Sequence, residues 1–136
     1  MTRIDLNRNK IEKCNDLEQF ARIFLPQSSA KQLRAAFMAI YCEIKNAPDQ
    51  QIQSTDHIAE KYQLSQSTVS KARAKMSKQG LGIIGMNRHG YYRLSDRLEG
   101  TLNMIARLND RMKYPAESQE QIKIEKMMIE IAKGAD

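Results

Sequence analysis

The stretch that decides the fold is Leu64-Ser65-Gln66-Ser67-Thr68-Val69-Ser70-Lys71-Ala72-Arg73-Ala74-Lys75-Met76. Apolar residues occur in it at helical spacing, which predicts a helix with one buried face anchored by Leu64, Val69, Ala72 and Met76. The other positions carry hydroxyl, amide and basic groups, and no acidic residue occurs between Gln63 and Met86. The pattern indicates a helix that packs on one side and offers hydrogen-bond donors and positive charge on the other.

A shorter helix is expected directly before this one. Residues 54–56 (Ser-Thr-Asp) offer three candidate N-caps, and we expect the helix to run to about Tyr62. A turn at residues 63–64 follows, and Ser65 caps the second helix, which Gly80 ends. Two short capped helices joined by a tight turn are what a helix-turn-helix requires.

The character of the sequence becomes extended beyond Gly80. Residues 81–86 and 91–94 are rich in apolar, β-branched and aromatic side chains, and the segment between them ends in Gly90. This arrangement predicts a β-hairpin, or wing. Its turn holds Arg88 and His89 and no acidic residue, so the tip is positively charged.

The segment from Ile52 to Asp96 resembles the winged helix-turn-helix of ArsR-type and MarR-type bacterial regulators. The resemblance covers about 45 of the 136 residues and is carried by Ile58-Ala59, Leu64 to Ser70, Gln79-Gly80-Leu81 and Gly90 to Ser95. It implies a DNA-binding module whose second helix enters the major groove. The same module serves repressors, activators, and plasmid replication or partition proteins.

The sequence departs from the family pattern in two ways. Arg73, between Ala72 and Ala74, stands where the family usually has a core Leu. Either the helix is rotated slightly, so that its alanines face the core, or Arg73 lies at the edge of the buried face and extends its guanidinium to a phosphate. The clustered Cys, His or acidic ligands of ArsR-type metal sensors are also missing, so the resemblance does not imply metal sensing.

We predict a DNA interface on the outer face of the second helix and on the wing. Gln66 and Thr68 are the candidates for reading bases, whereas Lys71, Lys75 and Lys78 are expected to neutralise phosphates. The full predicted set is Thr55, Gln66, Ser67, Thr68, Ser70, Lys71, Arg73, Lys75, Lys78, Asn87, Arg88, His89 and Arg93.

The flanking sequence predicts helices on both sides of this module. An amphipathic helix is expected from Ile4 to Leu25 and a buried one from Ser29 to Ala47, so that residues 1–51 form a helical platform. Residues 97–136 are expected to form C-terminal helices, one ending near Lys113 and another over about residues 117–133. We expect one domain over residues 1–136, mainly α with a small β-hairpin wing.

The first C-terminal helix also suggests self-association. Its apolar positions follow alternating steps of four and three with one polar residue in the seam, at Leu98, Leu102, Ile105, Asn109 and Met112. A homodimer would place two recognition helices about one DNA turn apart. Packing within one chain is the alternative, and Leu108 fits that alternative better.

Composition agrees with a nucleic-acid partner. The net charge is +6 and the pI about 9.4, and residues 52–97 hold eight Lys or Arg against three Asp or Glu. No apolar run approaches the roughly 20 residues that span a bilayer, and the N-terminus has no secretory pattern, so a cytoplasmic protein is expected. Cys14 and Cys42 are expected to stay reduced.

The predicted function is sequence-specific binding of double-stranded DNA by a dimeric, repressor-like transcriptional regulator. A plasmid or phage replication or partition protein is the close alternative, and a winged-helix protein-interaction module is the alternative of another class. The latter is disfavoured because the second helix lacks aromatic or aliphatic anchors on its outer face. His57 and His89 have no triad-like or metal-like neighbours, so neither an enzyme nor a cofactor or metal is predicted.

Overall fold

The computed structural model describes residues 4–77 and 80–134, and the chain divides into two compact units. Unit 1 is Met1–Gly100 and unit 2 is Thr101–Asp136. The chain is mainly helical, as the sequence predicted, and it contains a small three-stranded antiparallel sheet, in which β1 joins the two strands of the predicted hairpin. The two units differ from the predicted single domain, because the helical residues beyond Gly100 keep their apolar side chains exposed and contribute none to the buried core.

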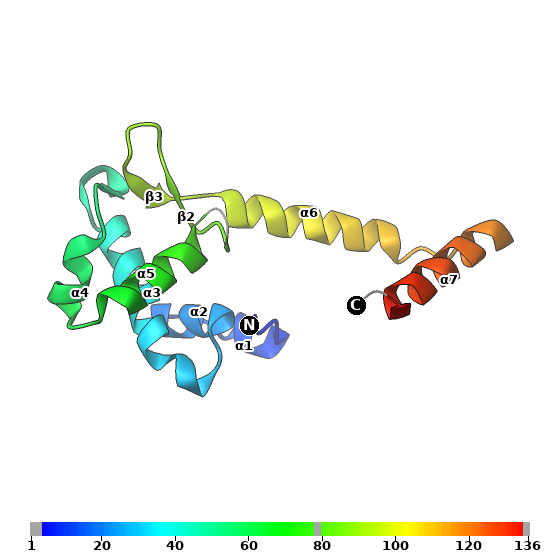
Figure 1. Ribbon diagram of the computed structural model, residues 1–136, viewed down its shortest axis with the longest axis horizontal. Helices are drawn as coiled ribbons and strands as arrows, with labels where there is room; N and C mark the ends of the chain where they lie inside the picture. Colours follow the sequence, from blue (N-terminus) through cyan, green and yellow to red (C-terminus); the bar gives the residue numbers. More distant parts are fainter. Residues whose placement is uncertain (1–3, 78–79, 135–136) are drawn as a thin grey trace. The chain divides into compact units, whose positions relative to one another are not determined.

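Unit 1 alternates short helices with very short strands (Figure 1). Its helices and strands are α1 (Arg8–Glu12), α2 (Leu17–Phe24), the 3-10 turn η1 (Ser28–Ala30), α3 (Lys31–Lys45), the 3-10 turn η2 (Pro48–Gln50), β1 (Gln51–Ile52), α4 (Asp56–Tyr62), α5 (Gln66–Met76), β2 (Ile84–Met86), β3 (Tyr92–Leu94) and the start of α6 (Arg97–Met112). The predicted helix pair, hairpin and C-terminal helix are all present.

The single helix predicted from Ile4 to Leu25 is wrong, because the structure divides this segment into α1 and α2. Each helix has its own cap: the Asn7 side chain accepts from the Lys10 backbone N–H, and the Asp16 side chain accepts from that of Gln19. Asp16 has an extended backbone, which interrupts helical hydrogen bonding before α2. Apolar periodicity runs through this break, so periodicity alone does not reveal it.

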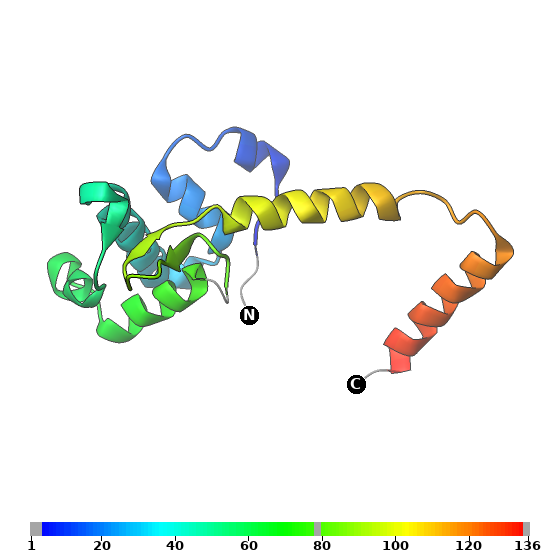
Figure 2. The same ribbon diagram turned by 90° about the horizontal axis from the view of Figure 1, so that it is seen from above.

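Helix α3 supplies more buried apolar residues than any other element of unit 1, and in Figure 2 it is seen between α2 and α5. Phe37, Ile40 and Ile44 of α3 are fully buried. The Phe37 ring lies 5.9 Å from the Phe24 ring and 6.4 Å from the Tyr41 ring, centroid to centroid. Burial of such side chains stabilises the fold by about 1.5–3 kcal/mol each.

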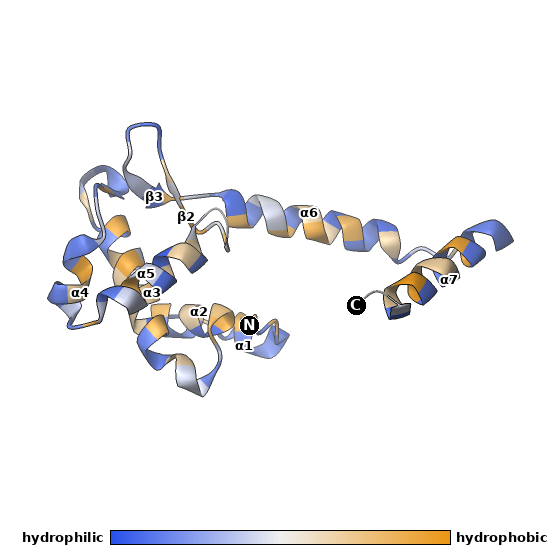
Figure 3. Cartoon of the chain, in the orientation of Figure 1, coloured by the Kyte–Doolittle hydropathy of each residue, from blue (hydrophilic) through white to orange (hydrophobic). Residues whose placement is uncertain are grey.

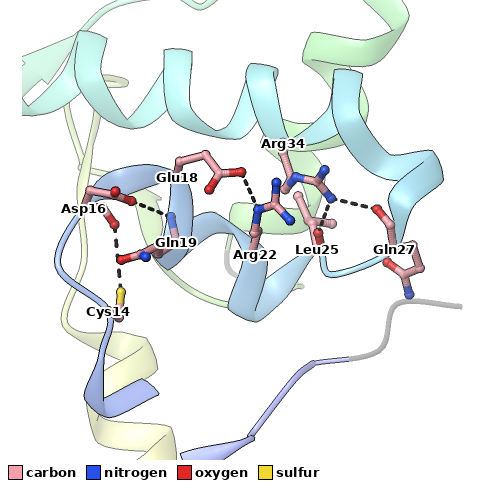
Figure 4. Close-up of polar contacts among 8 residues, drawn as sticks. All are labelled: Cys14, Asp16, Glu18, Gln19, Arg22, Leu25, Gln27 and Arg34. Carbon is pink, nitrogen blue, oxygen red and sulfur yellow. Dashed lines mark hydrogen bonds and ion pairs between the residues drawn. The ribbon is translucent and has the colours of Figure 1, made fainter. Parts of the chain in front are cut away.

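Arg34 is a charged residue within this apolar helix, and it is 5% exposed. Its Nη1 atom donates to the carbonyl oxygens of Leu25, at 2.8 Å, and Gln27, at 2.7 Å (Figure 4). The Leu25 carbonyl lies at the end of α2, where helical donors run out, and the Gln27 carbonyl also accepts from the Ala30 backbone N–H at 3.0 Å. Arg34 therefore fastens the α2–α3 connection to α3.

The three strands form an antiparallel sheet in the order β1-β3-β2. Ile52 pairs with Tyr92, and Tyr92 pairs with Met86 on its other side. The β2–β3 turn extends beyond the helices of unit 1 (Figure 1). Gly90 has a φ of +83° in this turn, a conformation that an L side chain rarely adopts.

Unit 2 consists of the remainder of α6 and of α7 (Gln119–Gly134). Leu98, in the first turn of α6, still packs against the core of unit 1. From Leu102 onward the large apolar residues of α6 and α7 are exposed. No helix in the described part of the chain is both long and apolar enough to span a membrane.

Candidate nucleic-acid interface

A tight turn joins α4 to α5. Gln63 adopts the left-handed conformation, with a φ of 58°, and the Leu64 N–H donates to the Ala59 carbonyl at 2.8 Å. The Ser65 hydroxyl then accepts from the Thr68 backbone N–H at 3.1 Å and caps α5 as predicted. These contacts fix the second helix directly against the first.

Helix α5 packs through three of the four predicted anchors, since Val69, Ala72 and Met76 are buried and Leu64 is half-buried against the core. At 100° per residue, the opposite side of the helix carries Ser67, Ser70, Lys71 and Ala74. All four residues are exposed. The outermost surface of α5 therefore consists of small hydroxyl groups, one lysine and one alanine.

The two residues predicted to read bases have neighbours within the protein. The Gln66 Nε2 atom donates to the Asp56 carbonyl oxygen at 3.0 Å, which links the starts of α4 and α5. The Thr68 hydroxyl is 2.7 Å from the Ser65 hydroxyl, at the cap. Ser67 and Ser70 project further from the core than either, so they extend the predicted interface outward.

Arg73 lies at the margin of α5. Its Nη1 atom donates to the Thr55 hydroxyl at 2.9 Å, and its guanidinium carbon is 6.0 Å from the centre of the Tyr92 ring. The helix packs on Ala72, whereas Arg73 joins α4, α5 and β3. Of the two alternatives that the sequence left open, the marginal position of Arg73 is the one observed, and its guanidinium is held by partners inside the protein.

Thr55 requires a correction. It is 2% exposed, and its hydroxyl accepts the hydrogen bond from Arg73. The sequence suggested an N-cap and a DNA contact, yet α4 begins with no side-chain cap bond from Thr55. The Ser54 hydroxyl instead accepts from the Asp56 N–H, at 3.0 Å. The Thr55 side chain is thus part of the internal structure and is not available to DNA.

An open groove of about 410 Å³ runs beside α5. Its walls come from α5 and from the α2–α3 connection, with lining residues Leu25, Gln27, Ser29, Ala30, Gln32, Leu33, Thr68, Lys71 and Lys75. Lys71 and Lys75 make no ion pair within the described chain. Sequence reasoning missed the wall opposite the lysines, because the bonds of Arg34 that hold it in place join residues distant in sequence.

The turn of the hairpin is organised by Asn87. Its Oδ1 atom accepts from the backbone N–H groups of His89 and Tyr91, at 2.9 and 3.0 Å, and its Nδ2 atom donates to Gln51 at 3.1 Å. Asn87 is therefore half-buried and engaged, while Arg88 and His89 are exposed at the tip. The predicted wing contacts thus divide into one residue that shapes the turn and two that face solvent.

Arg93 is separated from α5 by the sheet. Tyr92, its neighbour on β3, faces Arg73 of α5. Because successive strand residues point to opposite faces, the Arg93 side chain lies on the other face of the sheet. It is exposed there, away from the outer face of α5. Lys78, also predicted to contact phosphate, lies outside the described residues.

Glu43 of α3 holds α4 in place through three contacts. It lies 2.6 Å from Lys61 Nζ, accepts from the Tyr62 hydroxyl at 2.8 Å and is 3.5 Å from His57 Nε2. The hydrogen bond from Lys61 is the largest cause of a lowered pKa at Glu43, with smaller contributions from Tyr62 and His57 opposed by burial. The same contact raises the pKa of Lys61.

The acidic, Cys and His side chains do not form a metal site. Among the described residues, no three of these side chains are placed to hold an ion together.

No protein-family model matches the chain, and no curated protein or solved structure is similar to it at a significant level. The geometry of α5, the β2–β3 turn and the groove beside α5 is therefore the basis for the proposed function.

Proposed function

We propose that unit 1 is a winged helix-turn-helix, and that the protein binds double-stranded DNA with α5 in the major groove and the β2–β3 turn against the backbone. In this proposal the protein is a sequence-specific, repressor-like regulator of transcription. A plasmid or phage replication or partition protein would use the same surface and remains the close variant.

The observation that carries the proposal is the surface of α5. Ser67, Ser70 and Lys71 are exposed on the side opposite the buried anchors, and Lys71 and Lys75 have no ion-pair partner in the described chain. Unpaired lysines attract phosphates, and small hydroxyl side chains allow the helix to approach base edges closely. The exposed cation Arg88 at the hairpin tip supports a second contact with the DNA backbone.

A role as a protein-interaction module has less support. Interfaces between proteins concentrate binding energy in buried aromatic, aliphatic and Arg anchors. The exposed side of α5 has none of these, since its outermost residues are Ser67, Ser70, Lys71 and Ala74. The side is hydrophilic and basic, which favours a phosphate-bearing partner.

The test is a titration of the full chain with duplex DNA at several salt concentrations. Because each neutralised phosphate releases counterions, the logarithm of the affinity should fall linearly with the logarithm of the salt concentration. Lys71→Ala should weaken binding to all sequences and reduce the salt slope by about 1. Lys13→Ala, an exposed lysine after α1, is the matched control and should leave affinity and slope unchanged.

Specificity needs a separate measurement. Selection of bound duplexes from a random pool should enrich one consensus sequence, and Gln66→Ala should change that consensus, since Gln66 is exposed at the first position of α5. Undetectable affinity at low salt would contradict DNA binding altogether. Affinity without any enriched sequence would contradict the regulatory role and leave only non-specific binding.

A further inference from the structure

We infer that α6 and α7 of unit 2 form an interface with a second copy of this chain, so that the protein is a homodimer joined through its C-terminal helices. The apolar side chains of unit 2 are not buried by any part of the described chain. Every large apolar residue of unit 2 is exposed, with exposed fractions between 44% and 68%. Apolar residues cluster on both helices (Figure 3).

Four of the five exposed large apolar residues of α6 lie on one side of the helix. Leu102, Ile105, Leu108 and Met112 fall within about a third of the circumference at 100° per residue. Asn109 lies within the same stripe, while Asn103, Arg107 and Asp110 occupy the other side. One polar residue inside an apolar seam restricts the register of two helices, because it must meet a polar partner.

Helix α7 has two apolar strips. The broader one consists of Ile124, Met127, Met128 and Ile131, and the narrower one of Ile122 and Ile129, seven residues apart. Charged residues, Glu125 on one side and Lys126 on the other, separate the strips. A helix with two apolar faces can contact two neighbours at once, as helices do in a four-helix bundle. Two copies of α6 and α7 supply four helices.

The exposed area fits a dimer. The eleven large apolar residues of α6 and α7, at about half exposure, together present on the order of 1,000 Å² of surface. A standard interface buries about 800 Å² on each partner. The surface is therefore large enough for a stable dimer.

The charge of unit 2 favours a second copy as the partner. Residues 101–136 contain six Lys or Arg and six Asp or Glu, so the unit has no net charge. Two copies can meet there without net repulsion. Residues 1–100 carry sixteen Lys or Arg and ten Asp or Glu. A dimer through unit 2 keeps its two positively charged parts available for another partner, and self-association through unit 1 would oppose like charges.

The test is sedimentation equilibrium of the full chain, with one pair of matched variants. Ile105→Glu places a carboxylate in the apolar stripe of α6, and Asn103→Glu places the same group on the polar side of the same helix. We expect the wild type and Asn103→Glu to be dimers, and Ile105→Glu to raise the dimer dissociation constant by about 30-fold or more. Thermal unfolding should confirm that unit 1 is folded in all three.

The outcomes separate this inference from DNA binding. A wild-type monomer at high protein concentration would overturn it, as would equal dissociation constants for the two variants. Retained dimerisation by Ile105→Glu would likewise mean that the two copies do not meet through the apolar stripe of α6. If the wild type is a dimer that binds no DNA, the proposed function fails and the dimer remains; if Ile105→Glu binds DNA as a monomer, both hold.

Discussion

Units 1 and 2 both contain amphipathic helices, yet only unit 1 has a core. In unit 1, α3 is contacted by α2, α4, α5 and the sheet, and its residues Phe37, Ile40 and Ile44 are fully buried. In unit 2, α6 and α7 have apolar stripes of comparable quality, and no residue of either helix is buried. An apolar stripe thus predicts that one face of a helix will be buried, but it does not identify the partner that buries it.

The two units also differ in charge. Unit 1 carries the whole net charge of +6, and unit 2 is neutral. Unit 1, which is folded around its own core, carries the basic surface. Unit 2, which is neutral, carries the apolar surface. Phosphate binding and self-association are therefore expected to use separate parts of the chain. A substitution in one unit should change one of these two properties and leave the other unchanged.

The largest expected effect is on the core of unit 1. Phe37→Ala should lower the free energy of unfolding by about 3–5 kcal/mol, because it removes a fully buried ring and leaves a cavity. Tyr114→Ala, which removes an exposed aromatic side chain in unit 2, should cost less than about 0.5 kcal/mol. Urea unfolding followed by circular dichroism measures both. Equal losses of unfolding free energy would contradict the conclusion that unit 1 has a buried core and unit 2 has none.

The second expected effect is at Arg34. Arg34→Met should cost about 2–4 kcal/mol, because the buried carbonyl oxygen of Leu25 would lose its donor and the carbonyl oxygen of Gln27 would lose one of its two donors. Arg22→Met is the control: Arg22 is exposed and pairs with Glu18 on the surface of α2 (Figure 4). Its loss should cost less than about 1 kcal/mol. A small effect at Arg34 would show that the α2–α3 connection is held by other contacts.

Much of unit 1 could be predicted from the sequence, because its signals are local. Ser65 caps α5, Gly90 ends the hairpin turn, and the anchors Val69, Ala72 and Met76 are buried as helical spacing predicts. Two features of unit 1 could not be predicted, for different reasons. The break before α2 is a local cap hidden within a continuous apolar pattern, and the groove wall held by Arg34 depends on contacts nine and seven residues apart.

The candidate interface shows the same limit. Polar residues on the predicted outer face, such as Ser70 and Lys71, are exposed as helical geometry requires. Thr55 and Arg73 are also polar, and they bind each other inside the protein. Composition cannot separate these two cases, because a polar side chain serves equally as a ligand contact or as an internal hydrogen-bond partner. Only the three-dimensional neighbours decide.

A third, smaller effect concerns pH. The lowered pKa of Glu43 means that its ionised form stabilises the fold above its ordinary value of 4.5, and that this contribution is lost as the pH falls through the lower folded-state pKa. Glu43→Gln should cost about 1 kcal/mol at pH 7 and flatten the acid limb of stability. Glu130→Gln, whose pair with Lys133 in unit 2 is exposed, should change neither. Identical acid limbs would contradict a stabilising role for Glu43.

The smallest expected effect compares single cations of the two units. Arg88→Ala, at the hairpin tip, should weaken DNA binding about two- to fivefold, equivalent to about 0.5–1 kcal/mol, because one exposed phosphate contact is lost. Arg107→Ala removes the same charge from unit 2 and should leave the affinity unchanged at moderate salt. Arg93→Ala, on the face of the sheet turned away from α5, should behave like Arg107→Ala. Fluorescence anisotropy with one duplex compares all three, and equal losses would mean that only total charge attracts DNA, with no contribution from where the charge lies.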